Sequence, residues 1–476
     1  MSEATVTEID HTSGDLVVEG KGARPENAEL IGPRARVTAR VTGRGVTWKA
    51  RFPLVASRWG GKQLPLPSGE YRIEIAGVTV IGTMPMTIDE RLRIAAEGST
   101  VTIGPPMDPS IESPEARAAL ERRYSVPSAP LANAVFFESF YGRVAGDNPL
   151  ALDREIARVR PDITRYWSVV DYSVQVPDGA IAVVERSADW WRARGEARLL
   201  IVNDWLRHRF VKRSGQHVLQ TWHGTPLKRL ALHRHGFQPR RWGAVLKESR
   251  RWDVMLAQNP YAARILSKAY AFFTRPVWVE GYPRNDVLST GSGAEVRRSL
   301  GIADEERVLL YAPTWRDDRE EMVDFVDPTE LAESTSSVVL VRGHSRTLIP
   351  GQSASGPRVI DVTGFADVSR LMLAADALIT DYSSVMFDFS GTGKPMFFLV
   401  PDIDHYRGEL RGFYFDLEKR VPGPVVHTQD ELIEALEADP ATYTDKYAEW
   451  RSVFNARDDG HAAERVVARL IDQRLI

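Results

Sequence analysis

The run HVLQTWH (217–223) and six similar runs around it decide the fold of the middle of the chain. Each run is short and almost continuously apolar, without the alternation of a strand that has one face in water. Segments of helical composition separate several of them, a pattern typical of buried parallel strands joined by helices. The other runs are NAVFFES (133–139), RYWSVV (165–170), AIAVVE (180–185), RLLIVN (198–203), DVMLAQN (253–259) and VWVEGYP (277–283).

A second set of such runs follows a Gly/Ser break within residues 281–301. We therefore predict an α/β protein with two Rossmann-type doubly wound domains, residues 131–290 and 291–427, and a cleft between them, followed by helices over 428–476. In such sheets ligands bind beyond the carboxyl ends of the strands. The second set comprises VLLYAPT (308–314), SVVLVRGH (337–344), RVIDVT (358–363), ALITDYSS (377–384) and MFFLVP (396–401).

The N-terminal part differs in character from the rest. Short alternating runs such as YRIEIAG (71–77), separated by turn signals, predict a small β-sandwich over residues 27–110. We predict a flexible N-terminus over 1–26 and a linker with a short helix over 111–130.

The composition narrows the classes of function. The chain has 476 residues and a formal net charge of −3, so no overall field favours nucleic acid. It has no cysteine, which excludes disulfides, thiolate zinc sites and cysteine nucleophiles. The polar, acidic start does not resemble a signal peptide, and no apolar run is long enough to span a membrane. We expect a cytoplasmic protein with at most peripheral membrane contact.

The turn QTWHGTPLK (220–228) directly follows a predicted strand. Gly224 and Pro226 favour a tight turn that holds the imidazole of His223 at the strand end. A neutral histidine there can accept a proton from a hydroxyl nucleophile. The alternative is a structural histidine that caps the turn, but the Gly-Thr-Pro context favours catalysis.

Two further polar clusters close strands of the second domain. Arg342-Gly343-His344-Ser345-Arg346 suits a phosphate, because arginine donates hydrogen bonds in a rigid fork; a basic surface turn is the alternative. In TDYSSVMFD (380–388), Ser383 and Ser384 open a predicted helix and favour pyrophosphate binding. An ordinary helix cap by Asp381 or Ser383 is compatible with that role.

Weaker signals complete the candidate site. Thr314 and Arg316 end another strand, and Arg411 offers a guanidinium for a diphosphate. The sequence GTGK (391–394) is not a P-loop, because its upstream glycine is missing and Pro395 replaces Ser/Thr. No spacing typical of a metal site is present, so we expect neither a metal nor another cofactor.

The segment KRLALHRHGFQPRRWGAVLKESRRW (228–252) is basic and contains interleaved aromatic residues. This composition favours an anionic membrane surface over single-stranded nucleic acid, while a solvated helical face is the plain alternative. The residues predicted to contact the membrane are Arg240, Arg241, Trp242, Lys247, Arg250 and Arg251.

Taken in order, these motifs resemble the CDP-glycerol glycerophosphotransferases, the teichoic-acid primases and polymerases. The resemblance spans about 131–430 and includes FES-F-x-G (137–142) with Asn148-Pro149. It implies a two-lobed GT-B fold, metal-independent transfer of glycerol phosphate from CDP-glycerol to a lipid-linked or polymeric acceptor, and attachment to the cytoplasmic face of the membrane. A homo-oligomer is a further possibility.

The resemblance also implies individual roles. His223 is expected to be the general base, and the first domain is expected to hold the acceptor. His344, also counted as catalytic, is expected to hold the pyrophosphate together with Ser383, Ser384 and Arg411, and Asp388 is a candidate for the ribose. Arg342, Thr314, Arg316 and Asp381 complete the predicted substrate-binding set. Alternatives are a CDP-ribitol or nucleotide-sugar donor, and a non-catalytic glycan-binding protein.

Overall fold

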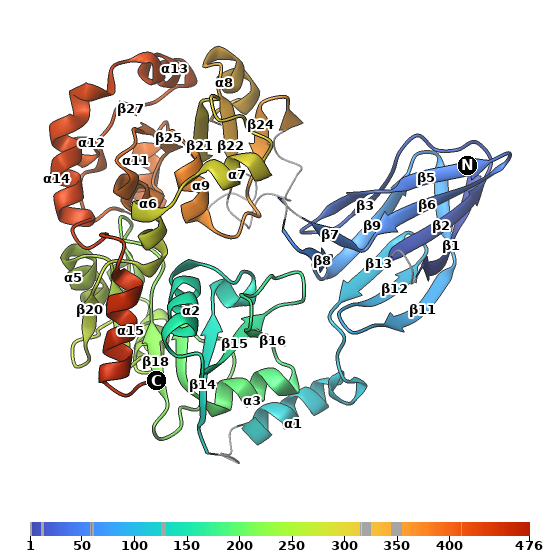
Figure 1. Cartoon of the computed structure of the whole chain (residues 1–476), viewed down its shortest axis with the longest axis horizontal. Helices are drawn as coiled ribbons and strands as arrows, with labels where there is room; N and C mark the ends of the chain where they lie inside the picture. The colour runs from blue at the N-terminus through green and yellow to red at the C-terminus, as the bar shows by residue number, and fades with distance from the viewer. Residues whose placement is uncertain are drawn as a thin grey trace.

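Two mostly antiparallel sheets form the N-terminal part of the computed structural model (Figure 1). Alternate side chains from both sheets, among them Leu16, Trp48, Phe52 and Tyr71, form one buried cluster. The first sheet has the order β10 (Val78–Ile81), β1 (Ser2–Asp10), β2 (Asp15–Lys21), β6 (Thr47–Pro53) and β5 (Arg40–Arg44). The second has β11 (Thr83–Ile88), β12 (Arg93–Glu97), β13 (Thr100–Gly104), β9 (Gly69–Ile75), β3 (Ala28–Ile31) and β4 (Arg36–Thr38). A separate hairpin joins β7 (Val55–Ser57) to β8 (Gln63–Pro65).

The prediction of a flexible segment over residues 1–26 is wrong for most of that range. β1 pairs with both β10 and β2, and β2 pairs with β6, so this segment supplies central strands of the first sheet. The structure describes residues 2–10, 14–57, 59, 61–124, 130–314, 316, 325–343, 355–410 and 412–476.

The first lobe, residues 130–290, contains a parallel sheet with helices on both faces (Figure 1). Its order is β16 (Ile181–Val184), β15 (Thr164–Val169), β14 (Ala132–Glu138), β17 (Ala197–Val202), β18 (His217–Gln220), β19 (Val254–Ala257) and β20 (Val277–Val279). The order therefore reverses between β14 and β17, which is where Rossmann-type sheets bind ligands. The helices are α2 (Asp147–Val159), α3 (Ala188–Glu196), α4 (Pro239–Ser249), α5 (Pro260–Ala269) and α6 (Asp286–Thr290), and α1 (Pro114–Tyr124) precedes the lobe.

The second lobe, residues 291–427, repeats this plan with one antiparallel edge strand. Its order is β23 (Ser355–Gly356), β24 (Val359–Asp361), β22 (Val338–Val341), β21 (Val308–Ala312), β25 (Ala377–Thr380), β26 (Met396–Leu399) and β27 (Val425–Val426). The order reverses between β21 and β25. The helices are α7 (Ala294–Ser299), α8 (Pro328–Ser334), α9 (Val368–Ala374), α10 (Val385–Phe389), α11 (Ile403–His405) and α12 (Leu417–Arg420).

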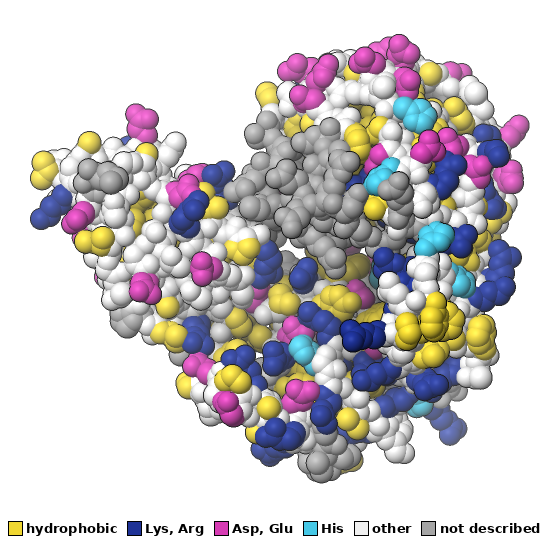
Figure 2. All heavy atoms as spheres, turned by 180° about the vertical axis from the view of Figure 1, so that it is seen from behind, with side chains coloured by type: hydrophobic (Ala, Val, Ile, Leu, Met, Phe, Trp, Pro, Cys, Tyr) yellow, Lys and Arg dark blue, Asp and Glu magenta, His cyan; other side chains and the backbone are white. Residues whose placement is uncertain are grey.

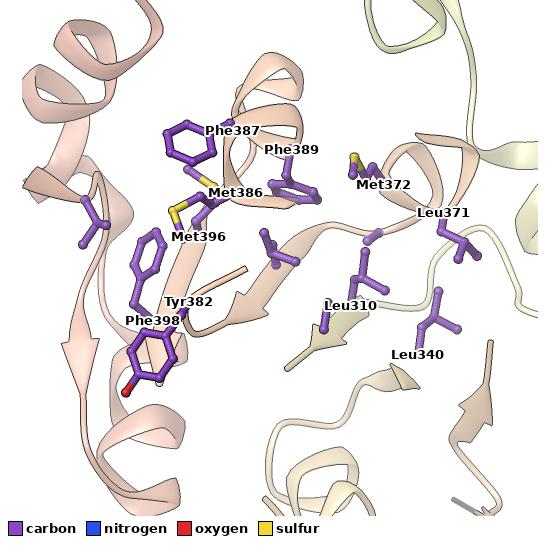
Figure 3. Close-up of a cluster of buried hydrophobic side chains, with 14 of the residues drawn as sticks. Leu310, Leu340, Leu371, Met372, Tyr382, Met386, Phe387, Phe389, Met396 and Phe398 are labelled. Carbon is purple, nitrogen blue, oxygen red and sulfur yellow. The ribbon is translucent and has the colours of Figure 1, made fainter. Parts of the chain in front are cut away.

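A buried cluster anchors the turn after β25 (Figure 3). Met386, Phe387 and Phe389 of α10 pack near Met396 and Phe398 of the next strand. Tyr382 lies at the edge of this cluster with its hydroxyl directed outward, where it donates to Asp402 Oδ1 at 3.0 Å. Packing on this scale fixes the backbone of the serine turn, residues 381–384, more firmly than a short helix does alone.

The C-terminal helices return the chain to the first lobe. They are α13 (Gln429–Glu437), α14 (Thr444–Phe454) and α15 (Ala462–Asp472). Val466, Val467 and Leu470 of α15 join a core cluster with Leu152 and Ile156 of α2 (Figure 1). The lobes also meet through an antiparallel bridge between Lys228 and Phe413.

Candidate functional site

His223 lies at the carboxyl end of β18, one strand from the reversal of strand order. Its ring stacks on Trp222 with centroids 4.7 Å apart and lies 5.7 Å from the ring of Phe140. Trp222 has a positive φ of 56°, which turns the chain sharply before the histidine. The imidazole is half-buried, so it is held by neighbours on one side and accessible on the other.

The hydrogen bond of His223 selects the tautomer that a base needs. Nδ1 lies 2.6 Å from the carbonyl oxygen of Asn203. Because a carbonyl only accepts, Nδ1 carries the proton, and Nε2 of the neutral ring keeps a free lone pair. Asn203 itself is fixed, since its amide accepts from Phe140 N at 2.9 Å and donates to Ser139 Oγ at 3.1 Å. Asn203 was not predicted, although its place at the end of RLLIVN was a usable signal.

The FES motif forms a strained turn beside the histidine. Phe140, Tyr141 and Gly142 all have positive φ values, of 45°, 59° and 74°. Non-glycine residues rarely adopt this conformation, and it persists only where the surroundings fix it. Here the Tyr141 hydroxyl donates to Asp204 Oδ1 at 2.7 Å, and Arg207 donates to the Tyr141 carbonyl at 3.0 Å. The turn therefore presents a rigid wall next to His223.

The serine turn of the second lobe lies directly against the His223 turn. A Cβ added to Gly224 would lie 2.7 Å from Ser384 Oγ and 3.1 Å from Ser384 Cβ. Only glycine permits this approach without a shift of the serine. Ser383 and Ser384 are half-buried, and Ser383 Oγ accepts from Val385 N at 3.4 Å. Residues predicted separately in the two lobes thus meet in one site.

Asp381 and Arg316 are engaged with each other rather than turned toward a ligand. Arg316 donates to Asp381 Oδ2 at 2.8 Å and, through two nitrogens, to Asp402 at 2.7 and 2.9 Å. Asp381 also accepts from Thr314 N at 2.9 Å. Arg316 and Asp381 are only 4% and 3% exposed. These contacts do not fit the predicted substrate binding and instead tie together the ends of β21, β25 and β26.

Both carboxylate oxygens of Asp388 accept hydrogen bonds from residues of the first lobe. Its Oδ2 accepts from Arg284 at 2.6 Å and its Oδ1 from Asn285 at 2.8 Å. Burial raises the pKa of this carboxyl to about 6 against the opposing effect of Arg284. With 3% of its surface exposed, Asp388 does not fit the predicted contact with a ribose. It joins the second lobe to the first.

Two other predicted substrate-binding residues, Thr314 and Arg342, lie near strand ends of the second lobe. The hydroxyl of Thr314 is buried and has no hydrogen-bond partner among the described residues, which suits a ligand contact. Arg342 donates to the carbonyls of Val362 and Phe365 at 3.1 and 2.8 Å, and burial lowers its pKa to about 10. His344 and Arg411 lie outside the described residues. Among the residues described, no three His, Cys, Asp or Glu side chains gather as a metal site.

The basic segment forms α4 and the turns on either side of it. Phe237 and Trp242 are 71% and 37% exposed, with rings 5.3 Å apart. In Figure 2, Lys and Arg side chains gather over the first lobe and surround a group of exposed hydrophobic side chains. No helix in the described ranges is both long and apolar enough to cross a bilayer. Arg240, Lys247 and Arg250 are exposed.

Two of the other residues predicted to contact the membrane form bonds with groups of the protein itself. Arg251 pairs with Glu248 at 2.8 Å, and Arg241 donates to the carbonyls of Arg234 and His235 at 3.2 and 3.3 Å. Trp252 is fully buried, so it does not contribute to an exposed aromatic surface. The exposed part of the segment is therefore smaller than the sequence suggested.

Comparison with known proteins extends over both lobes. The sequence model of the family CDP-Glycerol:Poly(glycerophosphate) glycerophosphotransferase matches residues 123–472. The teichoic acid poly(glycerol phosphate) polymerase of Bacillus subtilis is 37% identical over 323 residues, which are 63% of this chain and 43% of that protein. The teichoic acid glycerol-phosphate transferase of Staphylococcus aureus is 35% identical over 378 residues, 71% and 92% of the two chains.

A similar solved structure is also that of a teichoic acid polymerase. The wall teichoic acid polymerase TagF, in a form soaked with CDPG, superposes with a TM-score of 0.70 at 30% identity, over 75% of this chain and 94% of that one. The fold is thus a mixed α/β fold with parallel sheets, similar to that of TagF and GT-B-like. The chain spans less than half of the Bacillus subtilis polymerase, and the N-terminal sheets lie outside the family match. With a match that covers both lobes and the turns that meet between them, the chain belongs to the CDP-glycerol:poly(glycerophosphate) glycerophosphotransferase family.

Proposed function

We propose that this protein transfers glycerol phosphate from CDP-glycerol to a lipid-linked or polymeric acceptor in the synthesis of a teichoic-acid-like cell-envelope polymer, with release of CMP. The observation that carries the proposal is the contact between the His223 turn and the serine turn in a member of this family. One turn offers a base, and the other offers hydroxyl and backbone donors for a diphosphate.

In the proposed reaction, Nε2 of His223 removes the proton from the terminal hydroxyl of the acceptor. The hydroxyl oxygen attacks the β-phosphorus of the donor, the bond from that phosphorus to the bridging oxygen breaks, and CMP leaves with the electron pair. Ser383, Ser384 and the buried hydroxyl of Thr314 support the diphosphate in this scheme. His344 and Arg411 retain their predicted contacts to the diphosphate as part of the proposal.

The test is CMP release from a panel of donors in the presence of a lipid-linked acceptor. We expect release from CDP-glycerol and much slower release from CDP-ribitol, because the relatives described above bear glycerol phosphate in their names. Faster turnover of CDP-ribitol or a nucleotide-sugar would show that the donor is a different one, bound in the same site. Binding of glycan without binding of any nucleotide, measured by calorimetry, would contradict the enzymatic function.

We also propose that the first lobe binds the cytoplasmic face of the membrane, where a lipid-linked acceptor is available. The exposed Phe237–Trp242 pair and the cations of Arg240, Lys247 and Arg250 support this. Reversing the three charges to Glu should weaken binding to anionic vesicles by at least about 100-fold, because loss of each cation removes about 1 kcal/mol of attraction and each new carboxylate adds repulsion.

The matched control reverses three exposed cations elsewhere, Arg158, Arg192 and Lys419, whose side chains are 64%, 58% and 85% exposed. Both variants change the net charge equally, so a membrane surface at α4 predicts loss of flotation only in the first. Equal flotation of the two variants would contradict the placement of the membrane surface.

We further propose that the N-terminal sheets form a sandwich domain, which docks on both lobes together with the β7–β8 hairpin. Asp171 in the first lobe accepts from Arg34 and, at 2.8 Å, from Ser68 N. Trp59, beyond β7, lies 5.4 Å from the ring of Phe365 in the second lobe. Changing Trp59 and Arg34 to Ala should increase protease cleavage between the domain and the lobes, whereas unchanged cleavage would contradict the docking.

A further inference from the structure

Arg284 makes contacts that join three parts of the site. It lies in the turn Pro283–Asn285 after β20 and is 9% exposed. Its Nη1 donates to Asp147 Oδ2 at 2.6 Å and to the carbonyl oxygen of His223 at 3.1 Å. Its Nη2 donates to Asp388 Oδ2 at 2.6 Å. One guanidinium therefore holds groups from both lobes.

Each partner of Arg284 adjoins a predicted site motif. Asp147 begins α2 after the strained FES turn, and the His223 carbonyl belongs to the turn that carries the proposed base. Asp388 lies in α10, which begins directly after the serine turn. A second bond, from Asn285 Nδ2 to Asp388 Oδ1 at 2.8 Å, runs parallel to that of Arg284.

We propose that Arg284 is a positioning residue that sets the His223 turn against the serine turn, so that base and donor phosphorus meet at reacting distance. This inference rests on the proposed function. Arg284 touches no reacting atom in the scheme and acts through His223 and Asp388. A planar guanidinium fixes angle as well as distance between its partners, which the single ammonium of lysine cannot do.

The buried carboxyl of Asp388 requires a cation at this position. Asp147 and Asp458 also lie near this carboxyl and oppose its ionisation, and Asn285 favours it. Removal of the cation would leave a buried carboxylate without compensation, which is costly. Other contacts between the lobes lie beside the Lys228–Phe413 bridge, where Tyr414 Oη accepts from Leu230 N at 3.1 Å, but the contact through Arg284 is the one that joins the His223 turn to α10.

The first test is steady-state kinetics of Arg284→Lys with CDP-glycerol and acceptor. We expect kcat to fall about 100-fold, because displacement of a catalytic group by about 1 Å has an effect of that size. The KM and the calorimetric affinity for CDP-glycerol should remain close to wild type, since Arg284 does not contact the donor in this scheme. Asp388→Asn, which keeps the shape of the side chain, should lower kcat in the same direction and serves if Arg284→Lys does not fold.

The matched control is Arg165→Lys. Arg165 forms a similar buried pair with Asp153, at 2.7 Å, but within the first lobe. Its loss should lower thermal stability as Arg284→Lys does while kcat per folded molecule stays near wild type. Equal kcat values in the two variants would overturn the proposal.

The second test measures the distance between the lobes independently of activity. Because the chain has no cysteine, spin labels attach only at Asp189→Cys and Lys419→Cys, whose native side chains are 70% and 85% exposed in different lobes. Arg284→Lys should broaden the distance distribution, and Arg165→Lys should not. An unchanged distribution would overturn the proposal, even with a lower kcat. Absence of CMP release by the wild type would reject the proposed function alone. The distance measurement would still test whether Arg284 holds the two lobes in position.

Discussion

The two lobes place polar side chains at similar strand ends but leave them in different states. In the first lobe, His223 uses Nδ1 to bond the Asn203 carbonyl, and no described residue bonds its Nε2. In the second lobe, Arg316 and Asp381 bond each other, and Arg316 is further held by Asp402. A strand end therefore predicts where a polar group lies. Whether the group is available to a substrate depends on partners from distant segments.

The largest expected effect is that of His223→Gln. Glutamine can still donate to the Asn203 carbonyl but cannot act as a base, so the rate of CMP release should fall about 10²- to 10⁴-fold. His217→Gln is the control, because His217 begins the same strand and lies half-buried at its opposite end. A wild-type rate for His223→Gln would remove the proposed difference between the lobes.

Arg316→Met should affect stability more than substrate affinity. Loss of one partner from a buried ion pair lowers the free energy of unfolding by about 3–5 kcal/mol. Arg407→Met breaks an exposed pair with Glu418, whose side chains are 40% and 39% exposed, and should cost at most about 1 kcal/mol. Denaturant unfolding measures both. A stable Arg316→Met enzyme with a raised KM for the donor would restore the predicted substrate contact.

Asp388→Asn tests the raised pKa of the buried Asp388 carboxyl through the pH dependence of stability. The pKa of Asp388 rises from its ordinary value of 3.8 to about 6 in the folded state, so the folded chain holds this proton more tightly than the unfolded chain. Its contribution to stability is therefore complete below the ordinary value and is lost as pH rises to about 6, by up to about 3 kcal/mol. The free energy of unfolding of wild type relative to Asp388→Asn should fall across that window. A flat difference would contradict the raised pKa.

The smallest expected effect is that of Gly224→Ala. The added Cβ would press on Ser384 Oγ, and overpacking of this kind costs about 1–3 kcal/mol, or roughly tenfold or more in rate if the turn moves. Ser384→Gly removes the obstructing atoms, so Gly224→Ala should have little further effect in that background. Additive rate losses in the double variant would show that the two turns do not touch during the reaction.

Much of this arrangement could be predicted from local sequence. Continuous apolar runs indicate the buried parallel strands, and a histidine next to glycine after such a run marks the proposed base. The partners of Asp381 and Asp388 could not be predicted, because Arg316 and Arg284 are distant from them in sequence and meet them only in the folded chain. β1 was missed because its acidic composition hides an alternation in which Ala4 and Val6 face the core.

In the proposed function, the His223 turn and the serine turn form one site for a CDP-activated donor. A crystal structure of the full chain with CDP-glycerol tests it most directly. We expect the diphosphate within hydrogen-bonding distance of Ser383 or Ser384, with the β-phosphorus facing Nε2 of His223. A donor bound with its diphosphate away from both turns would contradict it.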